Sequence, residues 1–409
     1  MQRILDRCAG LDVHKKTVTA CVRVPGTSGD RVQHVRTFGT TTAELLTLRD
    51  WLEAHRITHV AMESTGVYWR PVFHVLEEAF SCILANATQI AQVPGRKTDV
   101  NDAAWIAQLV ECGLVRASFI PPPPIRELRD LTRYRKLLIQ ERTRQANRLH
   151  KVLEDTGIKL TSVATRLLGA SGRAMLDALV AGTTDPAVLA DLARGKLRKK
   201  LPALRQALVG RFRAHHAFLV SQLLAHLDYL DEAIETVSAQ IDIAMVPFAE
   251  ELARLDTIHG VNKRTAEVVI AELGVDMTVF PSAKHAASWS GLCPGNHESA
   301  GKHRSGRTRH GNRWLRTALI EAALAAGVGS TKGAFAARYR RIRHRGHKKA
   351  VVAVAHAILV TAYHLLAHQT TYHDPGADYY DRRHAERVRR RAIQTLERQG
   401  YRVTLEPAA

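Results

Sequence analysis

The first part of the chain alternates hydrophobic and polar residues in a way that predicts a mixed α/β domain. Residues 4–24 contain Leu11, Val13 and Val18 in rough alternation, which is typical of a strand. Further strand patterns occupy 33–38, 59–62 and 82–85, and helical spacing occupies 42–55, 66–79 and 101–112. Strands followed by alternating strands and helices predict an α/β domain over residues 1–118.

The middle of the chain has a helical pattern. After a stiff break at Pro121–Pro124, hydrophobic residues recur at helical spacing over 125–155 and again over 204–245. We expect these two segments to pack as an antiparallel helical hairpin. They lie in a central region, 119–247, that also holds a mixed insertion over 157–201.

The pattern predicts a mainly α-helical C-terminal domain over residues 248–372. Its longest apolar run, Ala350–Leu366, includes His356 and His364, so we interpret it as a buried helix and not as a membrane span. Residues 373–409 form a polar, strongly basic tail.

The charge of the chain indicates its partner. The 409 residues include 59 Lys and Arg against 39 Asp and Glu, a formal net charge of +20. Proteins this basic usually bind a polyanion, so we expect nucleic acid; a solvated basic surface or an anionic membrane is the alternative. The five cysteines form no C-x-x-C pair and the N-terminus has no signal-peptide pattern, so we expect reduced thiols in the cytoplasm.

Four carboxylates stand where α/β folds tend to place their chemistry. Asp12 lies inside the first strand, and Glu63 directly follows a short apolar strand. Asp99 and Asp102 share one face at the start of the next helix. Together these side chains could hold two divalent cations about 3.5–4 Å apart for phosphoryl chemistry. Taken singly, Asp12 could start a turn, Glu63 could pair with Arg70, and either remaining aspartate could cap the helix.

A second candidate motif lies at residues 255–266, where the pattern predicts a helix, a tight turn and another helix. It is similar to a helix-hairpin-helix, in which turn amides at a helix N-terminus bind a phosphate. We expect Gly260, Lys263 and Arg264 to contact nucleic acid there. An ordinary helical hairpin is the alternative.

Residues 289–313 form a glycine-punctuated basic segment, which predicts a loop. Glycine with dense positive charge suits close approach to a sugar-phosphate backbone. The expected nucleic-acid contacts are Lys302, Arg304, Arg307, Arg309 and Arg313. Ser299 in this segment could attack phosphorus while neighbouring cations stabilise the added charge; the alternative is an ordinary polar loop residue.

The acidic motifs resemble those of a known family. Gly-Leu-Asp12-Val-His-Lys, Met-Glu63-Ser-Thr-Gly-Val-Tyr-Trp and Lys-Thr-Asp99-Val-Asn-Asp102-Ala are similar to the three motifs of the DEDD transposases of the insertion sequence 110 family. The resemblance implies an N-terminal RuvC-like domain of RNase H-type fold. It also implies that the four acids bind Mg²⁺ or Mn²⁺, two ions in all.

The C-terminal segment 291–319 is similar to the second conserved domain of the same family, which carries a catalytic serine. Ser299 matches that serine, although Ala300 stands before the expected glycine. Ser305 and Ser290 are therefore alternatives, and Ser305 is the stronger of the two.

The resemblance implies a recombinase that excises and inserts a mobile DNA element. Some members are guided by a structured RNA that the element encodes. They act as dimers that assemble into a tetramer, in which the RuvC-like tetrad of one subunit meets the serine domain of another. The central helical hairpin would then serve oligomerisation and nucleic-acid binding.

Two other functions fit parts of the pattern. In a junction-resolving or RNase H-like nuclease, water would hydrolyse the DNA and Ser299 would be inert. A non-catalytic nucleic-acid-binding protein would have a degenerate α/β domain, and the presence of all four acids argues against it. A covalent protein–DNA adduct separates the recombinase from the nuclease, because hydrolysis leaves none.

Overall fold

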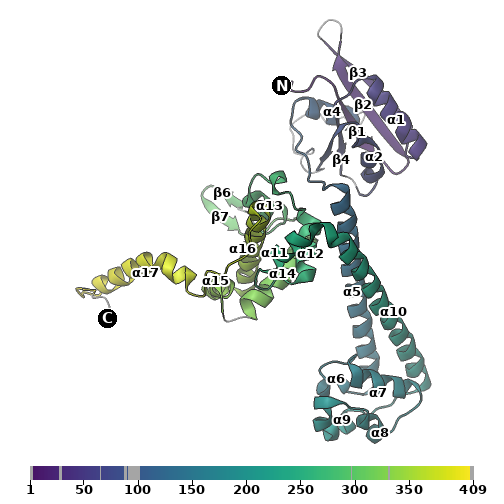
Figure 1. Ribbon diagram of the computed structural model, residues 1–409, viewed down its shortest axis with the longest axis vertical. Coiled ribbons are helices and arrows are strands. Elements are labelled where there is room, and N and C mark those ends of the chain that lie inside the picture. The colour runs from purple at the N-terminus through teal and green to yellow at the C-terminus, as the bar shows by residue number, and fades with distance from the viewer. Residues whose placement is uncertain are drawn as a thin grey trace. The chain divides into compact units, whose positions relative to one another are not determined.

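The computed structural model describes residues 3–26, 30–64, 66–86, 90, 102–295, 297–329 and 332–405. The chain divides into two compact units, Met1–Ile120 and Pro121–Ala409. The first unit is a mixed α/β fold and the second is mainly helical (Figure 1).

The first unit is built on a five-stranded sheet. Its strands are β1 (Cys8–Val13), β2 (Thr17–Pro25), β3 (Arg31–Gly39), β4 (His59–Glu63) and β5 (Ser81–Ala85). The spatial order is β3-β2-β1-β4-β5. β1, β2 and β3 pair antiparallel, whereas β4 runs parallel to β1 and β5 runs parallel to β4. The sheet is therefore mixed, with β1 at its centre.

Helices cover both faces of this sheet, because successive side chains of a strand point to opposite faces. Ala9 and Leu11 of β1 share a core with α1 (Thr42–Ala54) and α2 (Trp69–Leu76). Cys8 instead packs with Ile106 of α4 (Asp102–Glu111). One face of the sheet thus carries α1 and α2, and the opposite face carries α4.

The second unit begins with two long helices, α5 (Pro123–Thr156) and α10 (Ala214–Met245), which lie side by side in Figure 1. Leu149, late in α5, shares a core with Val220, early in α10. Leu138, nearer the middle of α5, packs with Leu230 further along α10. The two helices are therefore antiparallel, as their hydrophobic spacing predicts.

The second long helix begins later than residue 204, so the sequence-based start is wrong. The chain turns after α9 (Leu201–Ala207), and α10 begins at Ala214. The turn is held against the end of α5: the Arg211 amide donates to the Thr156 carbonyl (2.8 Å), and a Cβ added to Gly210 would lie 2.6 Å from the same oxygen. This tertiary contact breaks a segment whose hydrophobic pattern continues.

Between the two long helices lies a small helical cap. Its elements are α6 (Leu160–Val163), α7 (Ala170–Val180), α8 (Pro186–Asp191), the 3₁₀ helix η1 (Gly195–Lys200) and α9. Leu176 and Leu189 of the cap share one apolar core with Leu153 of α5 and Leu224 of α10. The predicted mixed insertion is thus a packed helical cap at the end of the two long helices (Figure 1).

The C-terminal part of the second unit packs around α16 (His347–His368). The other elements are η2 (Val246–Phe248), α11 (Ala249–Asp256), α12 (Lys263–Leu273), η3 (Met277–Val279), α13 (Ala283–Trp289), β6 (His297–Ser299), β7 (Lys302–Ser305), α14 (Arg313–Ala323), the π-helical turn η4 (Leu324–Val328), α15 (Ala334–Ile342), η5 (Arg343–Arg345) and α17 (Tyr379–Arg398). Among the described helices, α16 alone is long and apolar enough to cross a membrane by length and composition. Its packing against α13, α14 and α15 matches the predicted buried helix.

Candidate active site and nucleic-acid interface

β1 and β4 bring two of the predicted carboxylates to one end of the sheet. The parallel register pairs Leu11 with Met62, so the next residues on the two strands are Asp12 and Glu63. Neighbouring strands lie about 4.8 Å apart, and paired residues of a parallel ladder point to the same face. Both carboxylates therefore leave the carboxyl ends of adjacent strands on the face that α4 covers.

α4 is oriented so that its first residue lies at this same end. A Cβ added to Gly10 would lie 3.0 Å from the Cα of Ala107, and closer still to the backbone of Ala103 near the start of α4. At the other end of the helix, the Leu5 amide donates to the carbonyl of Glu111 (3.2 Å). α4 thus runs antiparallel to β1, which directs its first residue, Asp102, toward the carboxyl end of β1.

The far end of α4 is fixed by buried ion pairs. Glu111 is 2% exposed and its carboxylate contacts Arg23 Nε (2.7 Å) and Arg31 Nε (2.6 Å) on β2 and β3. Removing one partner of such a buried pair costs about 3–5 kcal/mol. These contacts hold α4 on the sheet and with it the position of Asp102.

The donor set suits a hard divalent cation, since Mg²⁺ prefers carboxylate oxygens. Asp12 is partly exposed and its Oδ2 lies 3.0 Å from Nε2 of His14. The predicted fourth acid, Asp99, lies outside the described residues. Within the described part of the chain, no three His, Cys, Asp or Glu side chains are grouped closely enough to hold one metal ion. Asp12, Glu63 and Asp102 share an end of the sheet without forming a closed metal site by themselves.

The basic segment predicted as a loop contains a β-hairpin. β6 and β7 pair antiparallel, with Ser299 opposite Lys302. The two residues between them, Ala300 and Gly301, have φ of +50° and +73°, as a two-residue hairpin turn requires. The expectation of an irregular loop is therefore wrong for residues 297–305, because an Ala-Gly pair is a weaker turn signal than Asn-Gly. Ser299 ends β6 next to this turn.

The structure separates the three serine candidates. Ser290 is fully buried and its hydroxyl donates to the carbonyl of Ala287 (2.9 Å), so it cannot meet a phosphodiester. Ser305 is half-buried and its Oγ accepts a hydrogen bond from the Arg307 amide (3.1 Å). The side chain of Ser299 lies outside the described structure, as does that of the predicted nucleic-acid contact Arg304.

The helix-hairpin-helix-like element predicted at 255–266 is formed by α11 and α12, and its turn is tightly packed. Gly260 has φ of +85°, and a Cβ there would lie 2.5 Å from the carbonyl oxygen of Ala322. Asn262 caps α12 by accepting from the Thr265 amide (2.9 Å). The amine of Lys263 donates to Asp242 (2.6 Å), which raises the pKa of that lysine and offsets its charge.

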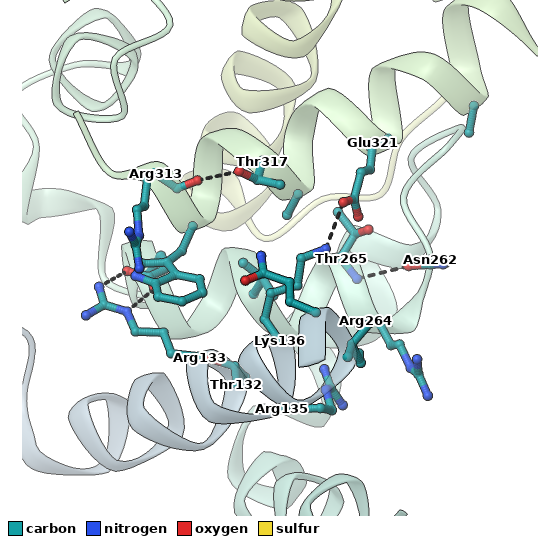
Figure 2. A pocket seen from close by; sticks show the side chains of 18 of the residues that line it. Thr132, Arg133, Arg135, Lys136, Asn262, Arg264, Thr265, Arg313, Thr317 and Glu321 are labelled. Atoms are coloured by element: carbon teal, nitrogen blue, oxygen red, sulfur yellow. Dashed lines mark hydrogen bonds and ion pairs between the residues drawn. The ribbon is translucent and has the colours of Figure 1, made fainter. Parts of the chain in front are cut away.

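A pocket of about 450 Å³ lies between α5, α12 and α14 (Figure 2). Three of the predicted nucleic-acid contacts line it: Gly260, Arg264 and Arg313. The guanidinium of Arg313 lies over the ring of Trp314, 4.5 Å from its centre. The predicted contacts Lys302, Arg307 and Arg309 are exposed. They lie close to Arg313 in the sequence but do not line the pocket.

Arginines of α5 complete this pocket, and they are bound to buried glutamates of α12. The fully buried Glu272 accepts two hydrogen bonds from Arg133 (2.7 and 2.8 Å) and one from Asn312 (2.5 Å). Glu267, 1% exposed, pairs with Arg135 (2.5 Å). The sequence did not predict this network, although Glu267 and Glu272, which stand among the apolar residues of 266–273, were an available signal.

The pocket therefore contains two kinds of cation. The cations of α5 are neutralised by glutamates of α12 and α14, and these ion pairs join the long helix to α12 and α14. Arg264 and Arg313 make no ion pair with any described residue, so their charge remains available to an anionic ligand. Both contribute to a rigid, concave and positively charged surface.

Sequence comparisons identify relatives of both units. A sequence model of DEDD transposases of the IS110 type, described as "Transposase", matches residues 9–158, and one described as "Transposase IS116/IS110/IS902 family" matches residues 252–340. A "Probable family 20 transposase" of Pseudomonas aeruginosa is 28% identical over 65% of this chain and 70% of its own length. An "Insertion element IS110 uncharacterized 43.6 kDa protein" of Streptomyces coelicolor is 29% identical over 68% and 73%. A "Transposase for insertion sequence element IS1111A" of Coxiella burnetii is 26% identical over 68% and 69%.

The two sequence models occur in order and together span more than half of the chain. The first includes the three acidic motifs, and the second includes the helix-hairpin-helix-like element and the serine hairpin. The chain belongs to the IS110 family of transposases, enzymes that cut DNA and transfer it to a new site.

Proposed function

We propose that this transposase excises and inserts a mobile element by carboxylate-assisted strand cleavage and a serine-linked DNA intermediate. The observation that carries the proposal is the placement of Asp12 and Glu63 on adjacent strand ends, with the first residue of α4, Asp102, directed toward the same end. The mixed sheet with helices on both faces is compatible with the RNase H-type fold that the resemblance implies.

Asp12, Glu63, Asp99 and Asp102 would hold two Mg²⁺ or Mn²⁺ ions. Bound cations of this kind polarise the scissile phosphate and neutralise the charge that develops on it. The protein contributes the rigid frame: the sheet sets the separation of the first two carboxylates, and the buried pairs of Glu111 set the position of α4.

In the cleavage step, a bond forms between Oγ of Ser299 and phosphorus. The bond from phosphorus to one deoxyribose oxygen breaks, and the serine proton passes to that departing oxygen. A deoxyribose hydroxyl at the new site reverses the step, so the phosphoester energy is conserved and no external energy source is required. Ser299 lies beside a hairpin turn that carries Lys302, whose charge would stabilise the extra negative charge on the phosphate.

The active form would be a homo-oligomer, a dimer that becomes a tetramer on DNA. Phe218, Tyr229 and Ile243 of α10 are 64%, 62% and 65% exposed. They are 11 and 14 residues apart, close to three and four helical turns, so they lie on one face of the helix. Exposed apolar side chains on one face of a helix support pairing with a second copy. We also include an element-encoded guide RNA as a partner, which sequencing of co-purified nucleic acid would test.

The carboxylates are tested by Asp12→Asn and Asp102→Asn. Each change should lower strand cleavage by roughly a thousandfold, because several kcal/mol of transition-state stabilisation are lost at about 1.4 kcal/mol per tenfold. DNA binding should persist. Asp50→Asn, an exposed carboxylate on α1, is the control and should leave cleavage unchanged. Normal cleavage by either site variant would contradict the proposal.

The serine is tested by trapping the protein–DNA adduct on a denaturing gel. Ser299→Ala should abolish both the adduct and recombination while DNA binding continues, and Asp12→Asn should also abolish the adduct. Ser305→Ala is the matched control and should retain it. An adduct that survives Ser299→Ala and disappears with Ser305→Ala would assign the nucleophile to Ser305. Strand cleavage by the wild type without any adduct would favour the hydrolytic nuclease.

A further inference from the structure

The helical cap at the end of the long helices, residues 157–213, is unusually basic. It contains eleven Lys and Arg against three Asp and Glu, a net charge of +8 in a segment that lies outside both family matches over 159–213. Like charges this dense repel one another and disfavour the folded cap unless a polyanion binds. The charge therefore needs an explanation beyond solubility.

Most of these cations have no acidic partner among the described residues. Lys159, Arg173 and Arg205 pair with carboxylates. Six others are exposed and make no ion pair within the cap or with any other described residue: Arg166, Arg194, Lys196, Arg198, Lys199 and Lys200. On the adjoining helix α5, Arg142 and Arg144 are paired with Asp231 and Glu141. The cap thus holds a cluster of unpaired positive charge.

The unpaired cations surround a concave surface. A shallow hollow of about 590 Å³ lies between the start of α7 and η1, and Arg166, Arg194, Lys196 and Lys200 line it. The backbone there is fixed, because the Arg194 amide donates to the Ser171 hydroxyl (2.9 Å) and the cap is packed on the apolar core of the long helices. A rigid groove of this kind can receive a ridge of phosphates without reorganisation.

We propose that the cap docks on the sugar-phosphate backbone of duplex DNA. Single-stranded nucleic acid is normally bound through exposed aromatic side chains that stack on bases. The cap has a single aromatic residue, Phe212, and that residue packs against the cap's apolar core. The cationic surface of the cap instead fits the phosphates of a duplex. Phosphate contacts fix the position of a protein on DNA and carry no sequence information. The inference rests on the proposed function only in requiring that the chain acts on DNA.

The length of α10 indicates how far along the DNA the cap would bind. The helix has 32 residues, which at 1.5 Å per residue is about 48 Å. At 3.4 Å per base pair, that corresponds to about 14 base pairs of duplex between the cap and the other end of α10. The cap would anchor flanking DNA well away from the C-terminal part that carries the serine hairpin.

The test compares two full-length variants of equal net charge. Arg194→Gln, Lys196→Gln and Lys199→Gln together remove three unpaired cap cations. Arg49→Gln, Arg144→Gln and Lys159→Gln together remove three cations that are already paired with carboxylates. Binding of a mixed-sequence 60-base-pair DNA duplex is measured by fluorescence anisotropy at several salt concentrations, with an RNA duplex of the same length as the second probe.

The cap variant should flatten the slope of log K against log salt by about 2.7, because each lost phosphate contact removes about 0.9. At 0.1 M salt this corresponds to roughly 500-fold weaker DNA binding, whereas the control variant should stay close to wild type. Equal losses in both variants would overturn the proposal in favour of overall charge, and a loss confined to the RNA duplex would assign the cap to RNA. Asp12→Asn should bind DNA like the wild type in the same assay. The binding result therefore tests the cap even if the proposed catalytic role of Asp12 is wrong.

Discussion

Gly10 is the residue through which the sheet controls the position of α4, so replacing it tests the site directly. An alanine Cβ at this position would lie 3.0 Å from the Cα of Ala107 and nearer still to the Ala103 carbonyl and the Ala107 amide. Ordinary carbon contacts are about 3.5–4.0 Å. The atoms in the way belong to backbone, which cannot rotate aside, so α4 must move away from β1 by about 1 Å.

This movement should reduce both stability and activity. Overpacking of this kind costs about 1–3 kcal/mol, so Gly10→Ala should lower the midpoint of thermal unfolding by several degrees. A shift of about 1 Å in a catalytic group can cost about a hundredfold in rate, and Asp102 is the first residue of the displaced helix. We therefore expect strand cleavage to fall by about a hundredfold in protein that remains folded.

The matched control is Gly39→Ala at the end of β3. The added Cβ there meets Cγ of Glu44 at 3.1 Å, a flexible side chain that can move aside. Differential scanning fluorimetry and a cleavage assay with Mg²⁺ should separate the two variants. If Gly10→Ala cleaves DNA as fast as Gly39→Ala does, the coupling between β1, α4 and the acidic site is wrong.

Two further predictions concern buried ionisable groups. Glu272→Gln should lower the free energy of unfolding by about 3–5 kcal/mol in urea titrations, because Arg133 loses its buried carboxylate; the exposed Glu321→Gln should have little effect, and equal effects would contradict the proposed network. Burial raises the pKa of the Cys8 thiol to about 11 and that of Cys82 to about 12, above the unfolded value of 9.0. Stability should therefore be complete below pH 9 and fall between pH 9 and 12 by up to about 1.4 kcal/mol per pH unit for each thiol, and the double alanine variant should show a flatter pH profile.

The sequence predicted the elements that repeat a local pattern. Strand-like patterns located β3, β4 and β5, and helical spacing located α1, α4, α5 and much of α10. These predictions depend only on which residues are apolar and at what spacing, which the chain itself specifies. The predicted start of α10 was wrong because Gly210 packs against Thr156, a residue 54 positions earlier in the chain. A local pattern contains no information about such a contact.

The candidate sites divide in the same way. The sequence by itself singled out the candidate side chains, Asp12, Glu63 and Asp102 among them, because charged residues at apolar strand ends and helix starts are costly without a role. Only the tertiary structure decided that these three are directed to one end of the sheet, that Ser290 is sealed in the core, and that Glu272 neutralises arginines of α5. The physical reason is that strand register, helix direction and buried ion pairs are set by contacts between residues far apart in the chain. Their energies depend on desolvation and packing that no single segment possesses before the chain has folded.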